Sequence, residues 1–143
     1  MHPYVDPSLY AALAAAGFRL AQTELVLAID LDEERVLEGP PVEGLRVEPV
    51  DPTSARDVDA YVTTASRIFF GDAVSSVLVE SIRRSVFHPR ATTLLARVGG
   101  ELAGVAGLER WRFGEREHAA LFGAAVLPAF RRRGVQRALF TYR

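Results

Sequence analysis

The sequence predicts a mixed α/β fold of the α+β kind, in which a mostly antiparallel sheet is flanked by helices. Two segments with helical periodicity follow one another between residues 51 and 87, and three segments of β character begin at residue 91. The pair Gly99-Gly100 provides the turn of a hairpin between the first two of these strands. A chain of 143 residues is long enough for one domain with an appendage and can bury its own core.

The composition excludes several classes of function. The 17 basic residues are balanced by 18 acidic ones, so the chain lacks the basic field of a dedicated nucleic-acid binder. All 17 basic residues are arginine, which we interpret as the coding bias of a GC-rich genome. Cysteine is absent, which removes disulfides, thiolate metal sites and cysteine nucleophiles. The three histidines lie far apart without metal-ligand spacing, so no metal site is predicted.

The first element is predicted to be a helix followed by a tight turn and a strand. Asp6 is expected to cap the helix, Pro7 to take its first position, and Gly17 to close it in a left-handed conformation. Residues 25–31 then alternate as a strand does. The apolar run 9–16 has no preceding basic residue and is too short to span a bilayer, so a soluble, cytoplasmic protein is predicted.

Residues 32–44 are predicted to be a linker, because they are acidic and contain two glycines and two prolines. This divides the chain into a helix–strand element at 1–31, the linker at 32–44, and a larger domain at 45–143.

The larger domain is predicted to open with a strand at 45–50 and two helices. Asp51 is expected to cap the first helix, with Pro52 at its first position, and Asp72 to cap the second. The apolar face of the first helix is expected to hold Val58, Tyr61, Val62, Ala65, Ile68 and Phe69. The corresponding face of the second is expected to hold Val74, Val77, Leu78, Ser81, Ile82 and Ser85.

Three strands are predicted to follow, at 92–98, 101–113 and 118–126. Pro128 stops the last of them, and a helix begins at the run from Arg131 to Gly134. This junction has the features of an anion site. A glycine lets backbone amides approach a ligand, the new helix directs its unpaired amides and positive dipole at the same point, and arginines suit phosphate oxygens.

The same junction resembles the acetyl-CoA signature of GNAT-type N-acetyltransferases, V-x-P-x-[FY]-[RQ]-x-x-G-x-[GA]-x-x-L. The match includes Val126, Pro128, Phe130, Arg131, Gly134 and Leu139. It departs at Gln136, where Gly or Ala is usual, which would tighten the cradle. The resemblance covers about 45–143 and implies a GNAT-like sheet that is incomplete at the C-terminus, because the family continues beyond the signature helix. Residues 1–31, with their "GF" turn, resemble the remnant of a preceding GNAT-like unit, as in bacterial proteins with a degenerate N-terminal half.

The resemblance implies acetyl-CoA as cosubstrate and two sets of contacts with it. The backbone of Ala125, Val126 and Leu127 would pair with the pantetheine arm. The loop amides would hold the pyrophosphate, through Arg131, Arg132, Arg133, Gly134, Val135 and Gln136. In this family an amine attacks the acetyl group directly, assisted by a base. Glu109, Glu117 and His118 are candidates for that base, none is assigned, and Tyr142 lies in the wrong element to serve as the acid.

The leading hypothesis is therefore an N-acetyltransferase that acts on a small-molecule or peptide primary amine. The alternative is a non-catalytic, degenerate GNAT module that binds CoA or a protein partner. Nucleic-acid binding through the arginine cluster is the least supported reading, and no nucleic-acid or membrane partner is expected. An exposed sheet edge on the third strand also predicts self-association of the chain.

Overall fold

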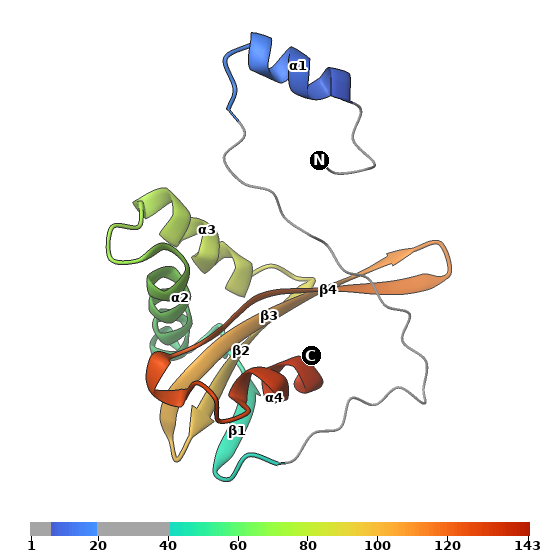
Figure 1. Cartoon of the computed structure of the whole chain (residues 1–143). Coiled ribbons are helices and arrows are strands. Elements are labelled where there is room, and N and C mark those ends of the chain that lie inside the picture. Colours follow the sequence, from blue (N-terminus) through green and yellow to red (C-terminus); the bar gives the residue numbers. More distant parts are fainter. Residues whose placement is uncertain (1–6, 20–40) are drawn as a thin grey trace. The chain divides into compact units, whose positions relative to one another are not determined.

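The computed structural model describes residues 7–19 and 41–143, which belong to two separate units, Met1–Arg35 and Val36–Arg143. The first unit contains helix α1 (Pro7–Ala15). The second contains, in chain order, β1 (Leu45–Pro49), α2 (Ala55–Phe70), α3 (Ser76–Val86), β2 (Ala91–Val98), β3 (Glu101–Phe113), β4 (Arg116–Val126), the short 3-10 helix η1 (Pro128–Phe130) and α4 (Val135–Tyr142) (Figure 1). No helix of the described residues is long and apolar enough to cross a membrane.

Helix α1 begins and ends as the sequence predicts. It starts at Pro7, and Gly17 closes it with a φ of +86°. The amide of Phe18 donates to the carbonyl of Leu13 at 3.0 Å, which satisfies one of the last carbonyls of the helix. Asp6, the predicted strand at 25–31 and residues 32–40 of the predicted linker lie outside the described residues.

The second unit is built on a four-stranded sheet with the order β1-β2-β3-β4, in which every neighbouring pair is antiparallel. This confirms the predicted fold class. Gly99 and Gly100 form the turn between β2 and β3, and β3 has the predicted bounds. Strand β4 begins two residues earlier than predicted, at Arg116, because its pairing with β3 continues to Phe113 opposite Arg116.

Both predicted helix caps in this unit are wrong. Ser54 rather than Asp51 caps α2, with its side chain accepting a hydrogen bond from the amide of Asp57. The carboxylate of Asp51 instead accepts bonds from the amide and hydroxyl of Thr53, at 2.8 and 2.7 Å, and so closes a turn ahead of the helix. In the same way Ser75 replaces Asp72 as the cap of α3. Each serine lies three residues beyond the predicted aspartate, so both helices start one turn later.

The predicted apolar face of α3 is also wrong in part. Val77 is 76% exposed, whereas Val79, Ile82 and Val86 pack against the core. These three residues lie three and four positions apart, so they share one face of the helix. Helix α3 packs against α2 and against β2, and the residues that face them form the narrower stripe.

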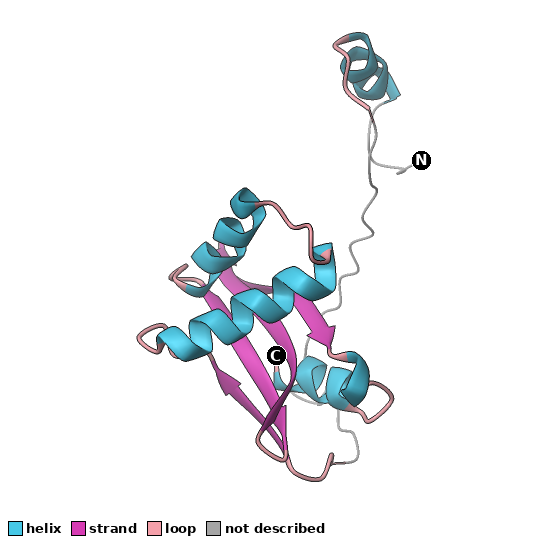
Figure 2. Cartoon of the chain, turned by 90° about the vertical axis from the view of Figure 1, so that its left-hand side faces the viewer, coloured by secondary structure: helices cyan, strands magenta, loops and turns pink. Residues whose placement is uncertain are grey.

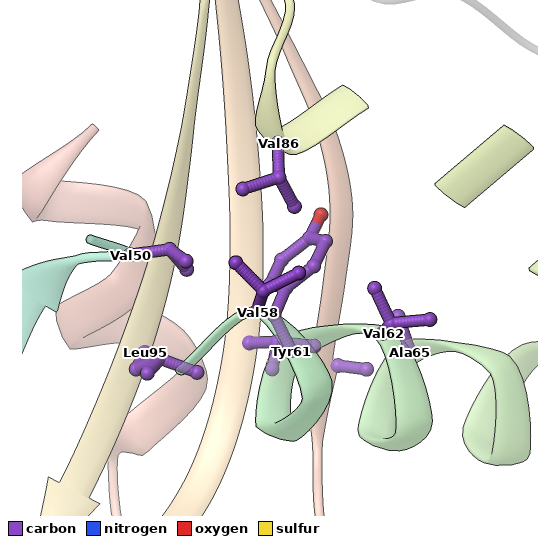
Figure 3. Close-up of a cluster of buried hydrophobic side chains, with 9 residues drawn as sticks. Val50, Val58, Tyr61, Val62, Ala65, Val86 and Leu95 are labelled. Atoms are coloured by element: carbon purple, nitrogen blue, oxygen red, sulfur yellow. The ribbon is translucent and has the colours of Figure 1, made fainter. Parts of the chain in front are cut away.

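Helices α2 and α3 cover one face of the sheet, and α4 covers the other (Figures 1 and 2). Tyr61 lies at the centre of the first face and is 2% exposed, and Figure 3 shows it among the side chains of α2, α3 and the strands. That cluster contains Val50, Val58, Tyr61, Val62, Ala65, Val86, Leu95, Val105 and Ala125. The predicted face of α2 is confirmed at its first four positions, while Phe69 is 46% exposed.

The other face packs against η1 and α4. Its cluster contains Leu94, Ala96, Val98, Ala103, Ala106, Val126, Phe130, Val135 and Leu139. Because successive strand residues point to opposite faces, neighbours such as Leu94 and Leu95 belong to different clusters. Both faces of the central strands are therefore buried, and helix α4 is anchored to this face of the sheet.

Candidate functional site

Strand β4 carries a bulge close to its end. Val105 pairs with Ala125, but Gly107 pairs with Phe122. Between these two pairs, β4 therefore contains one more residue than β3. Gly123 lies in the bulge with a φ of +57°, a left-handed conformation that side chains disfavour. A glycine inside a strand is a signal for such a bulge, which sequence reasoning did not use here. The bulge turns the end of β4 relative to β3.

Beyond the bulge, the backbone of β4 presents Val126 at its outer edge. The amide of Leu127 donates to the carbonyl of Ala103 on β3, at 2.9 Å. Because backbone groups of successive strand residues point in opposite directions, the N–H and C=O of Val126 point away from β3. The Nε of Arg131 donates to the Val126 carbonyl at 3.2 Å, which leaves the Val126 amide as the donor at this edge.

The loop between η1 and α4 has an unusual backbone. Arg132 has a φ of +60°, the one non-glycine residue in the described part of the chain with a positive φ, and Gly134 has a φ of +82°. Arg131 between the short helix and this turn is extended, with a φ of −67° and a ψ of 157°. At Gly134 a left-handed residue is followed by the right-handed residues of α4, and such a pair turns successive amides toward a common side, which is a known form of anion-binding concavity.

The start of α4 adds further free donors to this loop. The first backbone hydrogen bond of the helix runs from the amide of Ala138 to the carbonyl of Gly134, at 3.0 Å. The amides of Val135, Gln136 and Arg137 precede it and have no carbonyl within the helix to accept from them. These donors and the positive end of the helix dipole attract negative charge.

The charge around the loop is positive. Arg131, Arg132 and Arg137 line the groove beside the loop, and Arg133 stacks on the ring of Phe130 with its guanidinium carbon 5.3 Å from the centroid. Within residues 7–19 and 41–143, no carboxylate forms an ion pair with any of these four arginines. An anion in the groove would therefore meet arginines that are not ion-paired to any described carboxylate, although Arg131 also donates to the carbonyl of Val126.

Apolar anchors on both sides fix this loop in place. Phe130 precedes it and is 9% exposed, and Val135 and Leu139 follow it with exposures of 1% and 0%. All three belong to the cluster on the α4 face of the sheet. Because each buried side chain of this size contributes roughly 1.5–3 kcal/mol, the loop is held by its ends while its backbone donors remain accessible.

The groove has a volume of about 960 Å³ and is walled by three elements. The end of α2 supplies Ile68 and Phe69, β4 supplies Ala124, Ala125 and Val126, and α4 with the preceding loop supplies Phe130, Arg131, Arg132, Gly134, Val135, Gln136, Arg137 and Phe140. The groove thus joins an apolar strand edge to a cationic end. This arrangement suits a long ligand with an amide-containing arm and a phosphate group.

Seven of the nine residues predicted to bind the cofactor line this groove. They are Ala125, Val126, Arg131, Arg132, Gly134, Val135 and Gln136. Leu127 and Arg133 do not line it: the amide of Leu127 bonds to β3, and Arg133 lies over Phe130. Sequence reasoning missed Phe69, Arg137 and Phe140, since nothing in helical periodicity distinguishes a groove wall from the edge of a buried face.

None of the three candidate bases lines the groove. Glu109 pairs with Arg90 at 3.0 Å, and Glu117 with Arg112 at 3.3 Å. His118 stacks on Trp111, with ring centroids 5.8 Å apart. All three lie on the part of the β3–β4 hairpin between the bulge and the turn, which Figure 1 shows extending past the other strands. No group of three or more metal-ligating side chains is found in the described segments.

The fold is that of known acetyltransferases. An aminoglycoside acetyltransferase from an uncultured soil metagenomic sample, solved with sisomicin, superposes with a TM-score of 0.58 at 15% identity, over 69% of this chain and 66% of that one. A second, also from a soil metagenomic sample, gives 0.52 at 23% identity, over 68% of each chain. A predicted acetyltransferase from Clostridium acetobutylicum, solved with acetyl-CoA, gives 0.54 at 10% identity, over 68% of this chain and 70% of that one. The chain thus spans about two thirds of the length of these structures.

The sequence of the second unit identifies the family. Residues 60–142 match the sequence model of the acetyltransferase (GNAT) family, which is more than half of the chain. The chain belongs to this family, as the resemblance at the strand–loop–helix junction predicted. No curated protein sequence matches the chain.

Proposed function

We propose that the protein binds acetyl-CoA in the groove beside β4 and transfers the acetyl group to a primary amine. The observation that carries this proposal is the continuity of two features. The groove is lined both by Val126, whose amide points outward, and by arginines and the first residues of α4, whose amides have no partner within the helix. A CoA molecule has the matching order of an amide-containing arm followed by a pyrophosphate.

The chain's own residues have separate parts in this proposal. The amide of Val126 pairs with the pantetheine arm as a neighbouring strand would. The amides of Gly134, Val135 and Gln136 hold the pyrophosphate together with Arg131 and Arg132. When bound, acetyl-CoA supplies an acetyl thioester that an amine nitrogen can attack. Ile68 and Phe69 cover the groove from α2 and keep water from the arm.

The acceptor is proposed to be a small molecule with a primary amine. This rests on family membership and on the fold shared with aminoglycoside acetyltransferases. The base is left unassigned, because the groove lining within the described residues contains no carboxylate and no histidine. The same observation favours a second candidate function, in which the domain binds CoA without turning it over.

A thermal melt with and without acetyl-CoA separates these functions when it is combined with an activity assay. At about 100 times its dissociation constant, a ligand of the folded state alone adds roughly 2.7 kcal/mol of stability. A shifted melt together with transfer to a panel of primary amines, sisomicin included, is the expected result. A shifted melt without transfer supports the non-catalytic function, and an unshifted melt overturns both.

We also propose that the chain associates with itself through the outer edge of β4. In the sheet that the structure describes, β4 pairs with β3 on one side, and no described strand lies on the other. Such an edge offers unpaired backbone groups to a second copy. Light scattering over a range of concentrations is expected to show a mass that rises above that of the monomer. A monomeric mass at the highest concentration contradicts the proposal.

A further inference from the structure

Gly134 belongs to the loop between η1 and α4, residues 131–134, which we call the anion-binding loop. Val42, which precedes β1, packs beside this glycine. A Cβ placed on Gly134 would lie 3.0 Å from Cγ2 of Val42, so a methyl group of Val42 already occupies the space beside this glycine. Val42 is half-buried, whereas Pro41, Glu43 and Gly44 are exposed. Within residues 41–44, Val42 is therefore the one whose side chain packs against the rest of the domain.

The sheet, and not the loop, holds Val42 in this position. The amide of Leu45 at the start of β1 donates to the carbonyl of Val42 at 3.1 Å. The amide of Gly99, in the β2–β3 turn, donates to the carbonyl of Gly44 at 3.0 Å. These two bonds tie the segment to β1 and to the turn that follows β2. Val42 consequently presents its methyl groups to the loop from a fixed support.

Arg137 contacts the same glycine from the helix. One guanidinium nitrogen of Arg137 lies 3.6 Å from the position of the Gly134 Cβ, and Arg137 lines the main groove. It also lines a second groove of about 350 Å³, together with Pro41, Val42 and residues of α4. The space into which a Gly134 side chain would extend is thus bordered by both Val42 and Arg137.

We propose that Val42 is a positioning residue for the anion-binding loop. Its branched side chain, which has few rotamers, keeps Gly134 in the left-handed conformation that directs the first amides of α4 into the groove. The loop is then ordered before the ligand arrives, and binding does not have to order it. The proposal deepens the proposed function, and it rests on that function where it takes the ligand to be the pyrophosphate of CoA.

The first test measures binding by calorimetry with the full chain. Val42→Ala removes the two γ-methyl groups and is expected to weaken CoA binding by roughly tenfold, since ordering the loop then opposes binding. Binding of pantetheine, which lacks the pyrophosphate, is expected to stay unchanged. Val42→Ile keeps the Cγ2 methyl and is expected to retain the wild-type affinity. Pro41→Ala, which alters the second groove away from Gly134, is the matched control and is also expected to bind CoA normally.

The second test needs no ligand. NMR relaxation of the free protein is expected to show lower order parameters for the amides of residues 132–136 in Val42→Ala than in the wild type or in Pro41→Ala. A rigid backbone gives about 0.85 and a flexible one less than about 0.6. This measurement decides the role of Val42 even if the wild type fails to bind CoA, which would overturn the proposed function alone.

Two results overturn the inference. One is a Val42→Ala variant with wild-type order parameters in the loop and wild-type affinity for CoA. The other is an equal loss of affinity for CoA and pantetheine together with a lower melting temperature, because Val42 would then support the domain in general and not the loop.

Discussion

Two independent constraints disfavour a side chain at Gly134. The backbone there is left-handed, with a φ of +82°, and a methyl group of Val42 lies 3.0 Å from the place of a Cβ. A left-handed backbone costs an L-residue about 1–2 kcal/mol, whatever the space around it. The contact with Val42 adds to that cost, because its methyl group would have to shift while its backbone is hydrogen-bonded to the start of β1.

These constraints predict different effects for two glycine substitutions. Gly100→Ala places a methyl group on another left-handed residue, with a φ of +86° and no atom within 4 Å. It is expected to lower the free energy of unfolding by about 1–2 kcal/mol and to leave acetyl-CoA binding unchanged. Gly134→Ala is expected to cost more stability and also to weaken binding. Urea unfolding measures the stability of each variant, and calorimetry measures its binding of acetyl-CoA. Equal losses of stability in Gly100→Ala and Gly134→Ala would show that the contact with Val42 adds no cost.

The arginines of the loop should contribute more to acetyl-CoA binding than arginines elsewhere on the surface. Arg131 lines the groove and has no ion pair among the described residues. Arg131→Met is expected to weaken acetyl-CoA binding by roughly tenfold or more, because a charge-assisted hydrogen bond contributes about 1.5–3 kcal/mol. Raising the salt concentration should reduce the difference in acetyl-CoA affinity between the variant and the wild type, because salt screens the charge of Arg131.

Arg116 provides the matched control for this substitution. It is exposed at the start of β4, near the turn of the hairpin, and no ion pair of Arg116 is found in the described segments. Arg116→Met is expected to bind acetyl-CoA as the wild type does. If the two variants lost affinity equally, net charge and not the position of Arg131 would govern binding.

At the scale of elements, helix α2 is joined to the sheet through Tyr61. Burial raises the pKa of its hydroxyl above the ordinary value of 10.0, although a hydrogen bond with Ser85 of α3 and the charge of Arg143 act in the opposite direction. The folded protein therefore keeps this proton at a pH where the unfolded chain has lost it. The resulting stability is present in full below about pH 10 and is lost as the pH rises through the folded-state pKa.

Tyr61→Phe tests this dependence. The variant should lose about 1 kcal/mol at neutral pH, since the hydrogen bond to Ser85 is gone. Above pH 10.0 its free energy of unfolding should fall less steeply than that of the wild type, because the titrating group is absent. Tyr142→Phe, at a side chain that is 51% exposed, should keep the wild-type slope. Denaturant unfolding from pH 7 to 11 measures these slopes, and parallel curves for Tyr61→Phe and wild type would refute the argument.

The elements also show which structural features a sequence determines locally. Strand β3 and its turn were predictable, because alternation and the Gly99-Gly100 pair act over neighbouring residues. The caps of α2 and α3 were not, because Asp51 and Ser54 are both good caps, and only the competing bond from Thr53 decides between them. The groove walls were least predictable, since Phe69 and Phe140 come to line the same groove only after the chain has folded around the sheet.

The anion-binding loop was more predictable than the groove walls and less predictable than strand β3. The strand–proline–arginine–glycine order alone predicted a loop with free amides before a helix, because free amides at a helix start are a local property. Its role in binding the pyrophosphate remains a prediction. The support from Val42 was not predictable, because residue 42 and residue 134 are brought together by the pairing of β1 with β2 and by the packing of α4.

At the scale of the whole molecule, the sequence predicts a linker at 32–44 between residues 1–31 and a larger domain at 45–143. The groove is lined by residues between Ile68 and Phe140, and the loop is supported by Val42, so 41–143 holds every described part of the site. The predicted linker has the composition of an accessible segment, with two prolines, two glycines and five acidic residues. We therefore expect a protease to reach this segment before it reaches the sheet.

Limited digestion with a glutamate-specific protease tests this division. Cleavage is expected first after Glu33, Glu34 or Glu38, and slowly after Glu101 or Glu109, which lie in the paired strand β3. The large fragment should still unfold cooperatively and bind acetyl-CoA as tightly as the intact chain does, because all of the described site lies within it. Early cleavage in β3 would contradict the boundary. A stable fragment that had lost its affinity would instead show that residues 1–31 contribute to the site, and the protein would have to be treated as one functional unit.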